Sequence, residues 1–99
     1  MSWNEMSLFE QLSEVSGDVK RSIDSREKYL KKQTPSDFSY FYYNKAFELV
    51  LKLTLGDKEY RRREFIDEIF ELREYINGDA DIDPQIIINY WSQYEKAVS

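Results

Sequence analysis

Apolar residues recur along the chain at the spacing of amphipathic helices. Between residues 8 and 30 they stand three, four or seven positions apart: Leu8, Leu12, Val15, Val19, Ile23 and Leu30. The same spacing returns at 58–77 and at 84–98. The β-branched run Ile86-Ile87-Ile88 also fits a short strand, but Asp83-Pro84 before it is a typical helix start. The pattern predicts an all-α protein.

Glycine and proline divide the chain into five stretches of helical length. Ser2-Trp3-Asn4-Glu5 has the form of a capping box, and Thr34-Pro35 has that of an N-cap followed by Pro at the first helical position. Gly56 and Gly78 are typical of residues that end helices. The first apolar stripe crosses Gly17 without losing phase, so this stretch is either one kinked helix or two helices. We favour a break at Gly17.

The stretch between Pro35 and Gly56 is apolar on most of its sides. Its polar side consists only of Lys45, Glu48 and Lys52, with Phe41 among them. A helix that is apolar on so many sides is normally the middle member of a bundle. We therefore predict one domain over residues 1–99, an antiparallel bundle of four to five helices. This helix would be central, and the last two helices would pack against it as a hairpin.

The amino-acid composition argues against several classes of enzyme and of metal site. The 99 residues carry a net charge of −5 and include neither cysteine nor histidine. Thiolate chemistry, the commonest general base and the commonest transition-metal ligand are therefore missing. Carboxylate pairs such as Glu64 with Glu68 have helical spacing, but no predicted cleft shifts their pKa values. We predict a non-enzymatic protein with no metal and no cofactor.

The segment 77–83 carries alternating carboxylates at Asp79, Asp81 and Asp83 between two predicted helices. It resembles the middle of an EF-hand loop, which would imply calcium binding. In that alignment Ala80 replaces the turn glycine and Ile86 the closing glutamate. The alternative is that Asp79 and Asp83 are turn and N-cap residues and that Asp81 is solvated, and we favour it.

Location in the cell is expected to be cytoplasmic. No apolar run approaches the roughly 18 residues that a membrane span needs. The first residues carry Glu5, Glu10 and Glu14 in place of a basic signal region.

The most unusual local feature is an aromatic cluster that includes four consecutive aromatic residues at 40–43; its members are Phe38, Tyr40, Phe41, Tyr42, Tyr43 and Phe47. On a helix they point about 100° apart, so at least one must face outward. Exposed Tyr and Phe are typical of interface centres; the alternative is a helix surrounded by neighbours, with tyrosine hydroxyls reaching water.

The size and acidity resemble in class those of small bacterial or phage inhibitor, immunity and adaptor proteins. The leading hypothesis is a module that binds an unidentified protein partner or itself. Its candidate residues are Tyr40, Phe41, Tyr42, Tyr60, Glu64, Asp67, Glu68 and Glu71.

A basic segment at 18–32, with six cationic and three anionic residues, motivates the alternative of a nucleic-acid-associated accessory protein. The overall acidity opposes it. Its candidate phosphate-contacting residues are Lys20, Arg21, Lys28, Lys31, Lys32, Arg61, Arg62 and Arg63. If the aromatics and both basic clusters share one face, nucleic acid is favoured; separate faces favour a protein partner.

Overall fold

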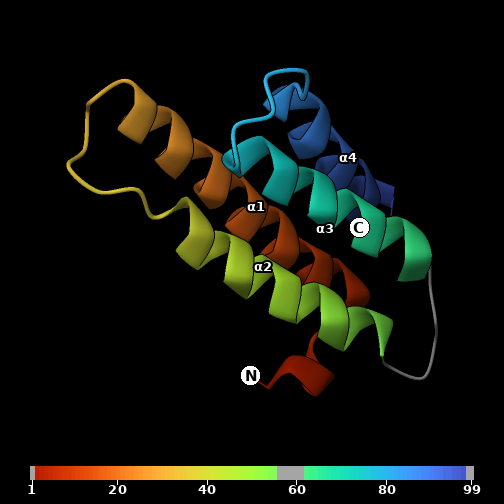
Figure 1. Cartoon of the computed structure of the whole chain (residues 1–99). Coiled ribbons are helices and arrows are strands. Elements are labelled where there is room, and N and C mark those ends of the chain that lie inside the picture. Colours follow the sequence, from red (N-terminus) through yellow and green to blue (C-terminus); the bar gives the residue numbers. More distant parts are fainter. Residues whose placement is uncertain (1, 56–61, 98–99) are drawn as a thin grey trace.

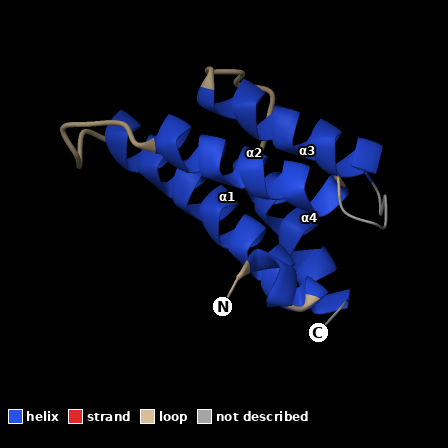
Figure 2. Ribbon diagram, turned by 90° about the horizontal axis from the view of Figure 1, so that it is seen from below, coloured by secondary structure: helices blue, strands red, loops and turns tan. Residues whose placement is uncertain are grey.

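Helices make up most of the computed structural model, which describes residues 2–55 and 62–97, without the side chain of Arg62. A short 3-10 helix, η1 (Trp3–Glu5), precedes four α-helices in the described part of the chain (Figures 1 and 2). These are α1 (Leu8–Leu30), α2 (Ser39–Thr54), α3 (Arg62–Ile76) and α4 (Pro84–Ala97). None of them is both long and apolar enough to cross a bilayer. The predicted all-α fold is confirmed, and the expected helix end at Gly56 lies outside the described residues.

The capping box of α1 lies five residues later than predicted. The Ser7 hydroxyl accepts a hydrogen bond from the Glu10 backbone N–H at 3.1 Å, and the Glu10 carboxylate accepts one from the Ser7 N–H at 3.2 Å. Ser2 instead precedes η1 and makes no side-chain cap. Ser7 to Glu10 has the same Ser-x-x-Glu pattern as Ser2 to Glu5 and stands directly before the apolar stripe. This second pattern therefore caps α1, and the prediction for Ser2 is wrong.

The predicted break at Gly17 is wrong, because α1 runs through it without interruption. Asp18 is almost fully buried, and its Oδ1 accepts a hydrogen bond from the Arg21 guanidinium at 2.8 Å. A methyl group at Gly17 would meet that guanidinium at 3.1 Å. The glycine therefore leaves room for the Arg21 side chain, and it does not end a helix.

The start of α2 also differs from the prediction, since Thr34-Pro35 lie in the loop before it. Asp37 prepares the helix start: its Oδ1 accepts from the Ser39 N–H at 2.8 Å, and its Oδ2 accepts from Arg26 Nη1 of α1 at 2.7 Å. One carboxylate thus joins the end of the loop to the neighbouring helix.

Two helices end in a left-handed residue that satisfies the last carbonyl groups. Gly78, as predicted, ends α3 with φ = 103°. Lys32 ends α1 with φ = 59°, where its N–H donates to the Tyr29 carbonyl and the Gln33 N–H donates to that of Lys28. A lysine at this position was not predicted because its side chain normally disfavours positive φ.

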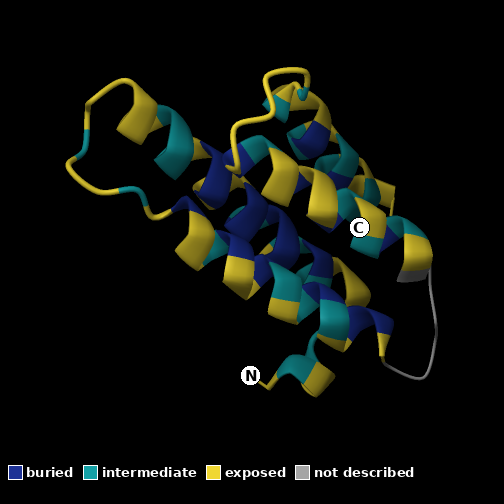
Figure 3. Cartoon of the chain, viewed as in Figure 1, coloured by how far each residue is buried: buried dark blue, intermediate teal, exposed yellow. Residues whose placement is uncertain are grey.

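Helix α1, and not α2, is the central member of the bundle. It packs against all three other helices, whereas α2 packs mainly against α1 and α3. The Ser22 hydroxyl donates to the Ser39 carbonyl at 2.9 Å, which shows how closely α1 approaches the start of α2. Figure 3 shows buried positions where these two helices face each other. The prediction placed α2 centrally because most of its sides are apolar, yet two of its aromatic residues, Tyr40 and Phe41, are exposed.

The last two helices form a looser pair than a simple hairpin, and α4 packs mainly against α1. Large rings fill the space between α3 and α4: Phe65 lies 5.2 Å from Trp91 and 5.4 Å from Tyr94, measured between ring centroids. Asp83 caps α4 through an Oδ1 that accepts from the Gln85 N–H at 2.9 Å. The segment around Ile87 is therefore helical, as favoured.

Candidate interaction surface

The outward side of α2 carries exposed apolar and charged residues. Phe41 is 56% exposed and lies on the predicted polar side with Lys45, Glu48 and Lys52, all of which are exposed as well. Phe38 just before the helix is 56% exposed, and Leu55 just after it is 64% exposed. We call these six residues the outer face of α2: Phe38, Phe41, Lys45, Glu48, Lys52 and Leu55.

Contacts within the chain hold the two central aromatic rings. The rings of Phe41 and Tyr42 meet edge to face, with centroids 5.2 Å apart. Lys45 Nζ lies 5.2 Å from the Phe41 ring centroid, and Arg21 Cζ lies 5.8 Å from that of Tyr42. Each ring therefore has a cation beside it, which restricts its motion.

Tyr40 faces in another direction, toward α3. Its hydroxyl donates to the side-chain oxygen of Asn77, just after α3. Farther along the same side of α2, the Phe47 ring packs 6.0 Å from that of Phe70. Tyr40 thus helps to join α2 to α3, and among the predicted aromatic candidates Phe41 and Tyr42 are the described ones that remain together. Tyr60 lies outside the described residues.

A hollow of about 250 Å³ joins this surface to α1. Its lining includes Phe38 and Tyr42 from one side and Arg21 and Lys28 from the other. Both cations are already paired, Arg21 with Asp18 at 2.8 Å and Lys28 with Asp24 at 3.0 Å. The hollow therefore has mixed character, with little net positive charge.

The remaining basic candidates point elsewhere. Lys20 lines a separate hollow of about 480 Å³ between α1 and the start of α4. Lys31 and Lys32 follow the last turn of α1, and Arg63 is exposed in the first turn of α3, at the far end of α2 from Phe38 (Figure 1). Arg61 and the Arg62 side chain lie outside the described residues. The aromatics thus share a face with only part of the basic set.

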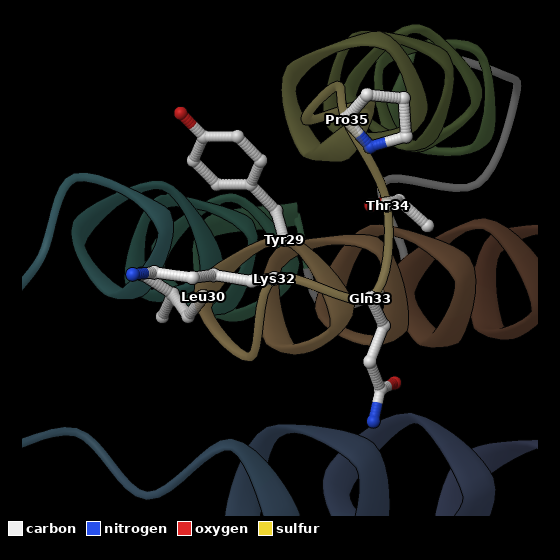
Figure 4. A pocket seen from close by; sticks show the side chains of 6 residues that line it. All are labelled: Tyr29, Leu30, Lys32, Gln33, Thr34 and Pro35. Atoms are coloured by element: carbon white, nitrogen blue, oxygen red, sulfur yellow. The ribbon is translucent and has the colours of Figure 1, made fainter.

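A further hollow, about 650 Å³ in volume, lies where α1 ends. Tyr29, Leu30 and Lys32 line it, together with three residues of the following loop. Their side chains spread in different directions instead of converging on one point (Figure 4). This arrangement is a concave end of the bundle and offers no set of groups for chemistry.

The acidic candidates lie along α3, and Glu64 at the start of this row contacts α4. Glu64 Oε1 accepts from the Tyr94 hydroxyl at 2.7 Å. Burial raises the pKa of Glu68, and the charges of Glu71, Glu64 and then Asp67 raise it further. Burial, and then the nearby Glu64, raise the pKa of the Tyr90 hydroxyl. The row is therefore a concentrated negative surface on a different side of the bundle.

Cation binding by the 77–83 segment finds no geometric support. Asp79 Oδ1 accepts from the Asp81 N–H at 3.0 Å, so it is a turn residue, and Asp83 caps α4. Within residues 2–55 and 62–97, no group of three or more acidic side chains is arranged to hold a metal ion.

The candidate binding residues left out two apolar residues of the outer face: Phe38, which was noted only as part of the aromatic cluster, and Leu55. Both flank the helix, and each stands three residues from a position that the pattern had already marked as outward, Phe41 or Lys52. Extending the outward stripe by one turn at each end would have found them. Comparison with known proteins adds no further evidence, since no family model, curated protein or solved structure matches the chain.

Proposed function

We propose that this protein is a non-enzymatic interaction module that binds a protein partner through the outer face of α2, acting as an inhibitor or regulator; a cytoplasmic location is part of the same proposal. The observation that carries it is Phe41, a large ring that is 56% exposed on the side of α2 opposite the core. Leaving such a ring in water costs apolar hydration free energy that binding would recover. Its contacts with Tyr42 and Lys45 restrict it in advance, so little side-chain entropy is lost on binding.

The test compares capture of binding proteins from an extract of the source organism by the immobilised wild type and two immobilised variants. The double variant Phe41→Ala/Tyr42→Ala should lose the captured protein while its circular dichroism stays helical. The control Ile86→Ala removes an apolar side chain that is 63% exposed at the start of α4, and it should capture as the wild type does. Equal capture by all three proteins would refute binding through α2.

The acidic row of α3 supports one refinement of the regulator role. Glu64, Asp67, Glu68 and Glu71 would suit a basic, nucleic-acid-binding target, because complementary charge speeds encounter. Replacing the four residues by their amides should then slow association at low salt and leave the dissociation rate nearly unchanged. An association rate that does not depend on these carboxylates would remove this refinement.

A second candidate function, nucleic-acid binding, rests on the hollow in which Phe38 and Tyr42 meet Arg21 and Lys28. Aromatic rings beside cations suit a single strand, whose bases stack while phosphates contact the cations. The partner carboxylates Asp18 and Asp24 oppose it. Fluorescence anisotropy with labelled single-stranded DNA and RNA at about 50 mM salt, which favours phosphate contacts, decides the matter. No binding under that condition excludes this candidate.

A further inference from the structure

The outer face of α2 has a regular internal order. From Phe38 its residues follow at intervals of three, four, three, four and three, the spacing of a coiled-coil stripe. Buried residues such as Tyr43, Ala46 and Val50 occupy the opposite side of the helix. Exposed positions follow the side of α2 that faces away from α1 (Figure 3). The stripe is therefore a solvent-facing line of side chains along α2 and its two flanking residues.

The stripe is complementary to itself when it is reversed. Phe38 and Leu55 stand at equal distances from its midpoint, as do Phe41 and Lys52, and as do Lys45 and Glu48. A twofold axis through that midpoint therefore places an apolar residue against an apolar residue at both ends. Next to each end, the same axis places the Phe41 ring of one copy against Lys52 of the other. At the middle it places Lys45 against Glu48, which carry opposite charges. Self-complementarity of this kind is what a twofold interface requires.

We propose that a second copy of the chain binds this face, with the two α2 helices antiparallel. Phe38 would contact the partner's Leu55, Phe41 the partner's Lys52, and Lys45 the partner's Glu48, each pair occurring twice. The proposal rests on the proposed function, because it names the partner of the same surface. It places the exposed Phe41 ring under a cation from each chain, which favours its burial.

Charge selects the antiparallel arrangement over the parallel one. In a parallel pair every residue of the stripe meets its own copy, so that lysine faces lysine at two layers and glutamate faces glutamate at a third. Like charges held opposite each other oppose association. The central Lys45–Glu48 pairs also fix the register, because a shift by one turn would separate them and place charges against apolar ends.

The extent of the face sets the strength of the dimer. A 16-residue helix is about 24 Å long, and one helix pair of that length buries less than the roughly 1,200 Å² typical of stable complexes. The dimer should therefore form in the micromolar range or more weakly and depend on both protein and salt concentration. Such reversible association suits a regulatory module.

Sedimentation velocity of the full chain from micromolar to millimolar concentration tests the arrangement through charge reversal. Lys45→Glu or Glu48→Lys alone creates two like-charge pairs at the centre and should weaken the dimer by about tenfold or more. The double variant, and a mixture of the two single variants, restores opposite charges and should restore association. Lys20→Glu, an equal change of charge beside α4, should leave the dimer unchanged.

A wild type that stays monomeric at millimolar concentration would overturn the proposal, as would a double variant that is as weak as the single variants. These outcomes are separate from failure of the proposed function. If the chain is monomeric but its capture of another protein still depends on Phe41 and Tyr42, the surface binds a different partner and only self-association is refuted. If neither self-association nor capture depends on Phe41, both proposals are refuted.

Discussion

The contact between Asp37 and Arg26 should contribute more to stability than any other ion pair described in this chain. The side chains are only 15% and 20% exposed, and the oxygen and nitrogen atoms lie 2.7 Å apart. In Asp37→Asn the Arg26 charge stays partly buried but loses its counter-ion. The Nε atom of Arg26 makes no hydrogen bond to the described residues even in the wild type. The loss of a charged hydrogen bond under these conditions costs about 2 kcal/mol, or about 10 °C in Tm for a chain of this size.

The dependence on pH follows from the same contact. Burial alone would raise the pKa of Asp37, but hydrogen bonds from Ser39 and Arg26, together with the Arg26 charge, outweigh burial and hold it below the usual value. A carboxyl group whose pKa is lower in the folded state stabilises the fold at pH values above the pKa that it has in the unfolded chain, which is near 3.9. This contribution to stability is lost as the pH falls through the pKa that Asp37 has in the folded state. The difference in free energy of unfolding between the wild type and Asp37→Asn should be largest at pH 7 and decrease below about pH 4.

Urea unfolding followed by circular dichroism measures both effects. Asp24→Asn is the matched control, because it removes the partner of Lys28 from a pair whose side chains are 60% and 50% exposed. That change should cost no more than about 0.5 kcal/mol. If Asp37→Asn costs as little as the control at pH 7, or if its cost persists undiminished at pH 3, the structural role assigned to Asp37 is wrong.

Three further substitutions have predictable signs by urea unfolding. Lys32→Gly should stabilise the fold by about 1 kcal/mol, because glycine relieves the positive φ at the end of α1; a loss of stability would contradict this. Glu68→Gln should stabilise by about 0.5 kcal/mol at pH 7. The gain should disappear below about pH 4, where the raised pKa leaves Glu68 protonated; a gain independent of pH would exclude charge repulsion as its cause. Gly17→Ala should stabilise α1 by up to about 1 kcal/mol, because the half-exposed Arg21 side chain that it meets needs to shift only slightly and keeps its contact with Asp18; destabilisation would show that the methyl group displaces Arg21 from Asp18.

The sequence was informative where local rules decide the structure. Helical spacing predicted the helices, Asp83 was correctly placed as the cap of α4, and Phe41 was correctly placed on an exposed side. Central position in the bundle was not predictable from apolarity alone, because α2 keeps exposed aromatic rings. Helix α1 packs closely with small buried residues such as Ser16 and Ser22. Small polar residues look like surface in a sequence and become interface only when a neighbouring helix covers them.

The candidate site was predicted in part, for a reason that is also physical. Spacing along one helix places Phe41 relative to Lys45, but it says nothing about how α3 is rotated relative to α2. The rotation turns Glu64 toward Tyr94 of α4 and brings Phe70 to Phe47. It thereby separates the acidic row from the aromatic residues that the sequence had grouped with it.

Phe41 is a large ring that the fold itself does not require. Its neighbour Tyr43 is buried, and Tyr42 is held by Arg21, so the needs of the core and of the α1–α2 contact are met without the Phe41 ring. A polar side chain at position 41 would suit the outward side of α2 at least as well, since burial of the helix on its other sides supplies its stability. The ring therefore costs the isolated chain solubility and gives its fold little in return. Only a second surface that covers it, in a partner or in another copy, turns that exposed area into favourable free energy.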